Sequence, residues 1–232
     1  MLPVFVIDDI SSSPHIVVEG DEAHHAIKVL RLAVDEKIIL TDGKGNWVEA
    51  SVSEIGKKNF TVDVLSRGFK EANSPELIVV QALTKSDRMR ETIELLTVAG
   101  ADRIIPWKAE RSIAQMKEDS REKWELVAVA ASKQSRRLRF PIIEEALTTK
   151  EVVQRFGPKV LVLHEVASQN LSSVKFLDGD SVVVVVGPEG GITDAELDAL
   201  GGTAVRLGDE VLRSAHAGFA ALSAIQALIG RW

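Results

Sequence analysis

Cysteine is absent from this chain of 232 residues, which excludes disulfide bonds and metal sites built on thiolates. The first residues lack a basic region followed by an apolar stretch, and no hydrophobic run reaches the length of a membrane span. The His, Asp and Glu residues show no spacing typical of metal ligands. We therefore expect a soluble, cytoplasmic protein that binds neither a membrane nor a metal.

Two nucleotide-binding motifs are missing as well. The glycine cluster at 187–191 is not followed by Lys-Ser or Lys-Thr, so it is no phosphate-binding P-loop, and the dinucleotide motif Gly-x-Gly-x-x-Gly does not occur. Internal repeats and low-complexity tracts are also absent. The remaining composition is globular, with 45% hydrophobic residues, and the length predicts one or two domains.

The glycine cluster follows a run of five valines at 182–186. A run without polar alternation predicts a strand buried on both faces, as in a parallel sheet. Thr193 and Glu196 form a capping-box pattern that starts the next helix. Because open α/β sheets bind small molecules beyond the carboxyl ends of their strands, we expect a ligand here. Glu189 in the loop would repel an anion but tolerate a cationic or neutral ligand. The alternative is a plain strand-to-helix turn.

Hydrophobic patterning divides the chain into two parts. Residues 1–70 contain short strand-like runs and one helix, a spacing typical of a small β-barrel. The turn-rich segment 66–75 marks the boundary, with a linker at 71–76. From 77 to 232 strands and helices alternate, which predicts an α/β domain with a parallel sheet. In the first part we expect strands at 4–7, 16–18, 37–40, 47–52 and 61–65 and a helix at 21–30. In the second part we expect strands at 77–83, 103–107, 159–164, 182–186 and 204–207 and helices at 86–100, 121–135, 148–155, 193–200 and 215–229.

The formal net charge of −6 argues against a general nucleic-acid binder, because affinity for the phosphate backbone comes from Lys and Arg. Positive charge is nevertheless concentrated in two short segments. One holds Lys85, Arg88 and Arg90, and the other holds Lys133, Arg136, Arg137 and Arg139. Either cluster alone could be a solvated helix face. Two of them in an acidic chain indicate a focused RNA surface.

Several motifs together resemble one enzyme family. They are Gly187-Pro-Glu-Gly-Gly191, Leu207-Gly-x-x-Val-Leu-Arg213, Ala82-Leu-Thr-Lys-Ser-Asp-Arg-Met89, Glu110-Arg-Ser112, Gln134-Ser-Arg-Arg137 and Leu163-His-Glu165. The first two resemble the S-adenosylmethionine site of the SPOUT methyltransferases. The whole set, spread over essentially the full length, resembles the ribosomal RNA small subunit methyltransferase E family, which methylates N3 of a uridine in 16S ribosomal RNA.

The resemblance implies a SPOUT-like α/β domain with a C-terminal trefoil knot, preceded by a PUA-like RNA-binding β-barrel. It implies S-adenosyl-L-methionine as cofactor, 16S ribosomal RNA in the small ribosomal subunit as partner, and a homodimer in which helix 215–229 contributes to the contact. The alternative for that helix is that its apolar stripe packs on its own sheet. The residues implied at the cofactor are Leu163, His164, Glu165, Gly187, Pro188, Glu189, Gly190, Gly191, Leu207, Gly208, Val211 and Leu212.

Methylation at N3 removes a proton from uracil and leaves negative charge on O2 and O4. An arginine that donates to those oxygens would stabilise the anion, which makes Arg213, Arg136 and Arg137 the candidate catalytic residues. The proton acceptor is open between Glu165 and Glu189, each of which has a structural role as its alternative. The expected RNA contacts are Arg31, Lys85, Arg88, Arg90, Lys133, Gln134, Ser135 and Arg139.

The chain departs from the family pattern at a few positions. Ser214-Ala-His216 stands where Thr-Glu-Thr is usual, Lys133 replaces a common Glu, and Asp35 replaces a Gly. The altered segment raises the alternative of a non-catalytic RNA-binding or ribosome-assembly protein that has kept the fold. Retention of Arg213 and of the loop glycines favours an RNA-modifying enzyme. Among such enzymes, a ribose 2'-O-methyltransferase of the same superfamily is the alternative to the uracil-N3 enzyme.

Overall fold

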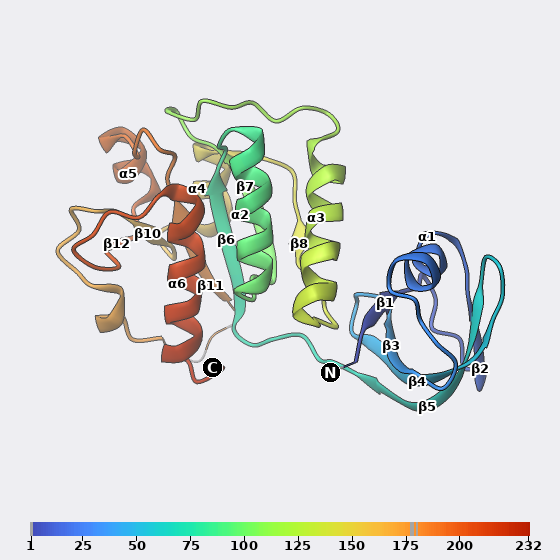
Figure 1. Ribbon diagram of the computed structural model, residues 1–232. Helices are drawn as coiled ribbons and strands as arrows, with labels where there is room; N and C mark the ends of the chain where they lie inside the picture. Colours follow the sequence, from blue (N-terminus) through green and yellow to red (C-terminus); the bar gives the residue numbers. More distant parts are fainter. Residues whose placement is uncertain (1, 177–178, 180) are drawn as a thin grey trace. The chain divides into compact units, whose positions relative to one another are not determined.

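The computed structural model describes residues 2–176, 179 and 181–232, with the backbone alone of Ser86. The chain divides into two compact units, one formed by residues up to 72 together with 129–140, the other by 73–128 together with 141–232. Each unit is built on a sheet of its own, and Figure 1 labels most of the helices and strands.

The first unit contains a five-stranded sheet in the order β1-β3-β4-β5-β2. Neighbouring strands are antiparallel, except that β1 and β3 run parallel. Ile38 and Leu40, two residues apart on β3, are fully buried in the core with Val48 and Phe60, as the period of two in a strand requires. The strands are β1 (Val4–Val6), β2 (His15–Val18), β3 (Lys37–Thr41), β4 (Asn46–Ile55) and β5 (Phe60–Phe69).

The helix expected at 21–30 is present in two forms. α1 (Gly20–His24) is α-helical and continues directly into a π-helix (His25–Val29), with Ala23 and Ala26 buried in the core of the unit. Arg31, shortly after it, has a left-handed backbone with a φ of 55°.

The turn-rich segment expected at 66–75 begins later in the structure. β5 continues through Phe69, and Gly68 packs so closely on Trp47 that a Cβ would lie 2.4 Å from Cζ2 of the indole. This glycine is therefore a strand residue that a neighbouring ring covers, which composition alone cannot distinguish from a linker glycine. Within residues 70–75, all of which are described, the chain forms no helix or strand.

Residues 129–140 belong to the first unit, although the sequence led us to expect them in the second. Lys133 forms an ion pair with Glu22 at 2.6 Å, and a Cβ on Gly43 would meet the ring of Phe140 at 2.5 Å. These contacts join residues about 100 positions apart, so local patterns gave no sign of them. The division into two functional domains stays a prediction.

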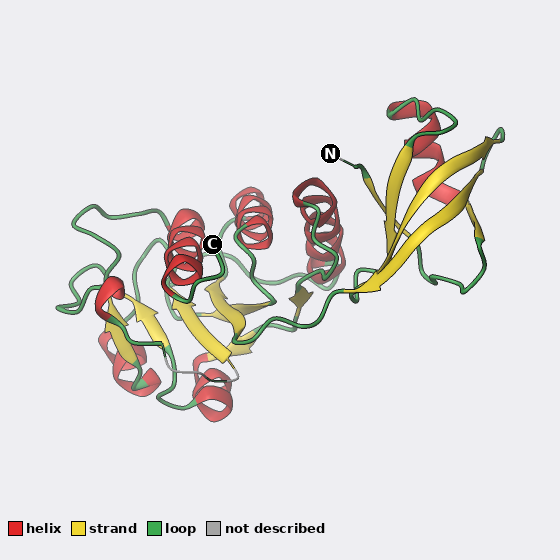
Figure 2. Ribbon diagram, turned by 90° about the horizontal axis from the view of Figure 1, so that it is seen from below, coloured by secondary structure: helices red, strands yellow, loops and turns green. Residues whose placement is uncertain are grey.

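The second unit contains a seven-stranded parallel sheet in the order β12-β10-β11-β6-β7-β8, with β9 also pairing with β7. Helices cover both faces of this sheet (Figure 2). The strands are β6 (Glu76–Ala82), β7 (Arg103–Lys108), β8 (Ile142–Ile143), β9 (Leu147–Thr148), β10 (Leu161–Leu163), β11 (Ser181–Val186) and β12 (Thr203–Val205). The helices are α2 (Ser86–Val98), α4 (Thr149–Phe156), α5 (Asp194–Leu200) and α6 (Ser214–Leu228), with a 3-10 turn at Leu171–Ser173. α3 (Ser120–Ser135) begins in this unit, and its residues from 129 on belong to the first unit.

The valine run of β11 explains why this sheet has two cores. Val184 and Val186 pack in one core with residues of α2, α6 and the first half of α3, whereas Val183 and Val185 pack in the other with residues of α4 and α5. The prediction of a strand buried on both faces is thus confirmed. The capping box predicted for Thr193 is also present, and a second box at Thr148 starts α4.

The C-terminal helix returns across the sheet. β12 forms one edge, yet α6, which follows it, packs against β11, β6 and α2. Such a return is the path that a knotted domain needs, and the threading itself stays a prediction. In the described part of the chain no helix is long and apolar enough to cross a membrane.

Candidate active site

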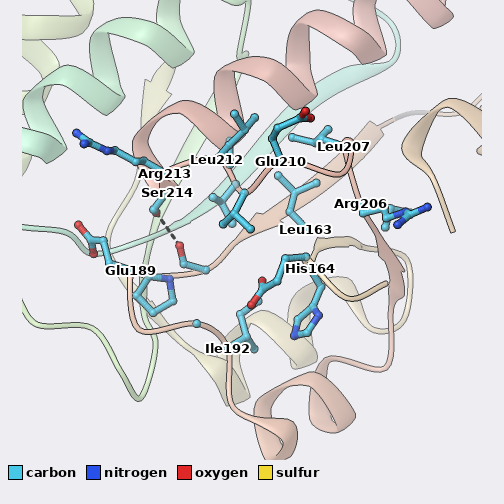
Figure 3. Close-up of a pocket in the computed structure, with 18 of the residues that line it drawn as sticks. Leu163, His164, Glu189, Ile192, Arg206, Leu207, Glu210, Leu212, Arg213 and Ser214 are labelled. Carbon is cyan, nitrogen blue, oxygen red and sulfur yellow. Dashed lines mark hydrogen bonds between the residues drawn. The ribbon is translucent and has the colours of Figure 1, made fainter. Parts of the chain in front are cut away.

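A pocket of about 330 Å³ lies at the carboxyl ends of three adjacent strands, β10, β11 and β12. Its walls come from the loops that follow these strands and from the start of α6 (Figure 3). The volume is in the range of pockets that hold small molecules. A cavity thus lies where the sequence predicts a ligand, and the binding of a ligand there stays a prediction.

All the residues predicted at the cofactor line this pocket except Gly190, and Arg213 lines it too. Seven further lining residues were not predicted: Val186, Ile192, Val205, Arg206, Glu210, Ser214 and Ala217. Five of them directly adjoin a predicted residue, so extending each motif by one position would have found these five. The exceptions are Val205, which lies two positions before Leu207 on β12, and Ala217, which reaches the pocket from within α6.

The loop after β11 needs glycine for two different local reasons. A Cβ on Gly187 would lie 2.7 Å from Cγ1 of Ile192, so the loop could not fold back on itself. Gly191 has a φ of 77°, which L-residues rarely adopt, whereas a Cβ there would come no closer than 3.8 Å to Arg111. At Gly191 the backbone conformation, and not a lack of space within the chain, requires glycine.

Gly190 does not line the pocket but packs on Arg111. Nη1 of Arg111 donates to the carbonyl of Gly190 at 3.0 Å, and a Cβ on Gly190 would approach Cβ of Arg111 at 3.2 Å. In the same motif, the carboxylate of Glu110 accepts a hydrogen bond from Thr193, the N-cap residue of α5. The Glu110-Arg-Ser112 motif thus supports the glycine loop from the end of β7.

Charged side chains of both signs line the pocket. Glu165, Glu189 and Glu210 line it against two arginines, Arg206 and Arg213. Glu189 is held by Arg88 of α2, whose Nη1 lies 2.9 Å from Oε1. Arg88, predicted at the RNA, is therefore engaged with a pocket residue.

The loop after β12 forms an apolar lip. Val211 and Leu212 line the pocket and are 77% and 41% exposed, and Leu207 adds a third apolar side chain. At the base of the loop, Nε of Arg206 donates to Oδ1 of Asn170 at 2.8 Å. Exposed apolar side chains beside a cavity are suited to cover a flat ligand such as a nucleobase.

Ser214, the first residue of α6, lies between two parts of the pocket wall. Its hydroxyl donates to the carbonyl of Gly187 at 2.6 Å, the bond dashed in Figure 3, and accepts from the buried amide of Gln81. Arg213 precedes it, and in this view Arg213 and Glu189 lie on one side of the pocket and His164 and Arg206 on the other. Within the described part of the chain, no carboxylate pairs with the guanidinium of Arg213.

The residues predicted at the RNA are divided between the units. Those of 133–139 and Arg31 belong to the first unit, whereas Lys85, Arg88 and Arg90 belong to the second. Arg136 and Arg137 do not line the pocket. Arg139 donates to the carbonyl of Lys70 and lies over the ring of Phe69, and Nε of Arg137 donates to the carbonyl of Arg139. The basic segment is thus partly ordered by contacts within its own unit.

The shifted carboxyl pKa values of the second unit belong to groups that do not line the pocket. Hydrogen bonds from Arg155, and then from Arg103, hold the pKa of the Glu144 carboxyl below its ordinary value. Arg103 begins β7, and the two residues of β8 that precede Glu144 pair with the first two residues of β7, so this cluster lies near the amino ends of β6 and β7. Among the described residues, no group of three or more His, Asp or Glu side chains could hold a metal ion.

Comparisons with known proteins agree with this arrangement. Residues 71–226 match the family described as RNA methyltransferase domain, and residues 18–65 match the RNA methyltransferase PUA domain. The ribosomal RNA small subunit methyltransferase E of Mycobacterium bovis is 38% identical over 99% of this chain and 93% of that protein. The protein of the same name from Bacillus subtilis is 28% identical over 93% of this chain and 91% of its own.

A solved structure is similar over nearly the whole chain. It is the crystal structure of a ribosomal RNA small subunit methyltransferase E from Neisseria gonorrhoeae bound to S-adenosyl methionine. Its TM-score is 0.87 at 26% identity, and the match covers 98% of each chain.

Proposed function

This chain belongs to the ribosomal RNA small subunit methyltransferase E family, and we propose that it transfers a methyl group from S-adenosylmethionine to N3 of a uridine in 16S ribosomal RNA. The observation that carries the proposal is the pocket at the carboxyl ends of β10, β11 and β12, which brings the family's motif loops together around Arg213. The predicted family and the α/β fold with an N-terminal RNA methyltransferase PUA domain are confirmed.

The pocket's residues fit S-adenosylmethionine. Leu163, Leu207 and Leu212 offer an apolar surface for an adenine, and the carboxylates of Glu165 and Glu210 suit a cationic ligand. When bound, S-adenosylmethionine would supply an electrophilic methyl group, with its sulfonium sulfur leaving as a neutral thioether. The chain therefore has to orient the two reactants and handle one proton.

Arg213 is the residue that we assign to the charge of the base. It lines the pocket beside the cofactor loops, and no carboxylate among the described residues neutralises it. Loss of the N3 proton moves negative charge to O2 and O4, and a guanidinium that donates to one of these oxygens stabilises the anion. Glu165 and Glu189 line the same pocket and are the two candidate proton acceptors, of which Glu189 already accepts from Arg88.

RNA recognition falls to groups outside the pocket. An N3 enzyme must expose the pairing edge of the base, which requires a single-stranded or flipped nucleotide held by its flanks. Arg31 in the N-terminal unit and the segment of Gln134, Ser135, Arg136 and Arg137 are our candidates for these contacts. Lys85 and Arg90 on α2 are candidates in the second unit.

We further propose a homodimer that acts in the cytoplasm. Leu228 at the end of α6 is 45% exposed and Trp232 is 65% exposed, whereas Leu222 and Ile225 of the same helix are fully buried within the chain. Light scattering at micromolar concentration should give about twice the chain mass of 25.2 kDa. A mass of one chain would contradict the dimer.

The reaction is tested with purified protein, S-adenosylmethionine and small ribosomal subunits from cells that lack the protein. Nuclease digestion to nucleosides followed by mass spectrometry should reveal 3-methyluridine. A 2'-O-methylated nucleoside alone would move the protein to the ribose methyltransferases. No methylation of either subunits or naked RNA would favour a protein that binds RNA without catalysis.

A further inference from the structure

A buried glutamine stands at the end of β6, beside the pocket wall. Gln81 is fully buried, and the residues before it, from Leu77 to Val80, are all apolar. Burying an amide is costly unless its hydrogen bonds are made, so an apolar residue would suit this strand better for stability alone. In the sheet register Gln81 lies opposite Val186, the residue before Gly187.

The amide of Gln81 begins a chain of hydrogen bonds. Its Nε2 donates to Oγ of Ser214 at 3.0 Å, and Oγ of Ser214 donates to the carbonyl of Gly187 at 2.6 Å. Since a hydroxyl has one proton, the direction is set from amide to hydroxyl to carbonyl. Three segments distant in sequence, the end of β6, the start of α6 and the end of β11, are joined at one point.

The amide is only partly satisfied by this arrangement. Oε1 of Gln81 is buried and has no hydrogen-bond partner among the described residues. A Cβ on Gly218 would lie 3.4 Å from it, so the amide is wedged between Ser214 and Gly218, one turn apart on α6. A buried polar atom without a partner is rare in proteins and calls for a reason other than stability.

We propose that Gln81 is a positioning residue for methyl transfer, which through Ser214 fixes the Gly187 carbonyl and the start of α6 and thereby the place of Arg213. The inference rests on the proposed function. Ser214 and Gly187 both line the pocket, and Arg213 directly precedes Ser214. A misplacement of about 1 Å in a reacting constellation can lower a rate about 100-fold.

Four variants separate positioning from stability. Gln81→Leu and Ser214→Ala break the chain at its two members, and Ser214→Thr keeps the hydroxyl. Gln226→Leu is the matched control, because Gln226 is also a buried amide of this unit and donates to the carbonyl of Ala99, yet it does not line the pocket.

The turnover number is measured with saturating cofactor and RNA, at a temperature well below the unfolding transition of every variant. We expect Gln81→Leu and Ser214→Ala to lower kcat at least tenfold, Ser214→Thr to stay within threefold of the parent and Gln226→Leu within twofold. The double variant Gln81→Leu with Ser214→Ala should have a kcat no lower than that of the slower single variant, because both substitutions break the same series of hydrogen bonds. A kcat for Gln81→Leu equal to that of Gln226→Leu, or effects that multiply in the double variant, would overturn the inference.

Calorimetry with S-adenosylmethionine distinguishes this inference from the proposed function. If the parent binds the cofactor but methylates no RNA, the proposed function fails alone. Affinity then decides whether Gln81 positions the pocket wall: a tenfold loss in Gln81→Leu and Ser214→Ala, but not in Gln226→Leu, upholds that part of the inference, and equal affinities overturn it. A parent that binds no cofactor overturns both.

Discussion

The two ends of the parallel sheet in the second unit use their polar groups in opposite ways. At the amino ends of the strands, Arg103 pairs with Glu76 at 3.0 Å and with Glu144 at 2.6 Å, and Arg155 also pairs with Glu144. Every one of these charges has a partner of opposite sign. At the amino ends of the strands these charged side chains therefore neutralise one another within the chain.

At the carboxyl ends of the strands, several polar and apolar groups have no partner within the described part of the chain. Arg213 has no paired carboxylate among the described residues, Oε1 of Gln81 has no hydrogen bond, and Val211 exposes 77% of its surface. Gly191 adds a backbone conformation that costs conformational freedom. The comparison teaches that one end of the sheet stabilises the unit whereas the other is kept available for a ligand, as expected of an open α/β sheet.

The largest effect should come from Arg213→Ala. If Arg213 stabilises the charge that develops on the base, its loss should lower the methylation rate about 100-fold to 1000-fold, as the loss of one oxyanion donor does. The measurement is methyl transfer to small subunits, with circular dichroism to show that the fold is kept. Lys159→Ala, which removes an exposed cation just before β10 at the amino ends, should leave the rate unchanged. Equal methylation rates for the two variants would contradict the assignment of catalysis to the carboxyl ends of the strands.

The second effect concerns cofactor affinity. Gly191→Val forces a branched side chain into a left-handed backbone in the pocket wall, so calorimetry should show at least tenfold weaker binding of S-adenosylmethionine. Gly201→Val is the matched control, because Gly201 has a φ of 59° as the C-cap of α5 and does not line the pocket. It should lower stability without changing affinity. Unchanged affinity in Gly191→Val would move the cofactor elsewhere.

The third effect extends the comparison to the basic segment of the first unit. Arg136→Ala together with Arg137→Ala should weaken RNA binding severalfold and reduce the slope of log affinity against log salt by about one to two, because phosphate contacts release counterions. Arg121→Ala with Lys123→Ala removes the same charge from a paired, exposed part of α3 and should change neither quantity. If both double variants behave alike, the basic segment has no particular role at the RNA.

The smallest effect is on stability alone. Because its arginine partners lower the pKa of Glu144, its carboxylate stabilises the fold above the ordinary pKa of 4.5, and this contribution is lost as the pH falls through the lowered pKa. Glu144→Gln should therefore cost about 2 kcal/mol of unfolding free energy at pH 7. The difference should shrink below about pH 4, and the methylation rate should stay at the parent value. A pH-independent difference would show that the carboxylate's charge is not what matters.

Much of the second unit could be predicted because its signals are local. The valine run, the capping box at Thr193 and the alternation of strands and helices each depend on a few consecutive residues, and the structure contains all of them. The motif loops also identified most of the pocket. By contrast, β8 and β9 are strands of two residues each, too short to leave a pattern.

The remaining features depend on contacts between distant residues. Arg111 and Gly190 are 79 positions apart, and Gln81 and Ser214 are 133 apart, so neither pair is visible in any local window. For the same reason the sequence indicated that Gly190 faces a ligand, whereas the structure places it against Arg111. A glycine in a sequence can indicate that another group approaches its backbone closely, but it does not show whether that group is a ligand or a side chain of the same protein.

The claim that the carboxyl end of the sheet is a uracil-N3 methyltransferase site is tested most directly in cells. Mass spectrometry of 16S ribosomal RNA should find that 3-methyluridine disappears when the protein is removed, returns with the parent chain and does not return with Arg213→Ala. Persistence of 3-methyluridine without the protein, or its full return with Arg213→Ala, would contradict the account.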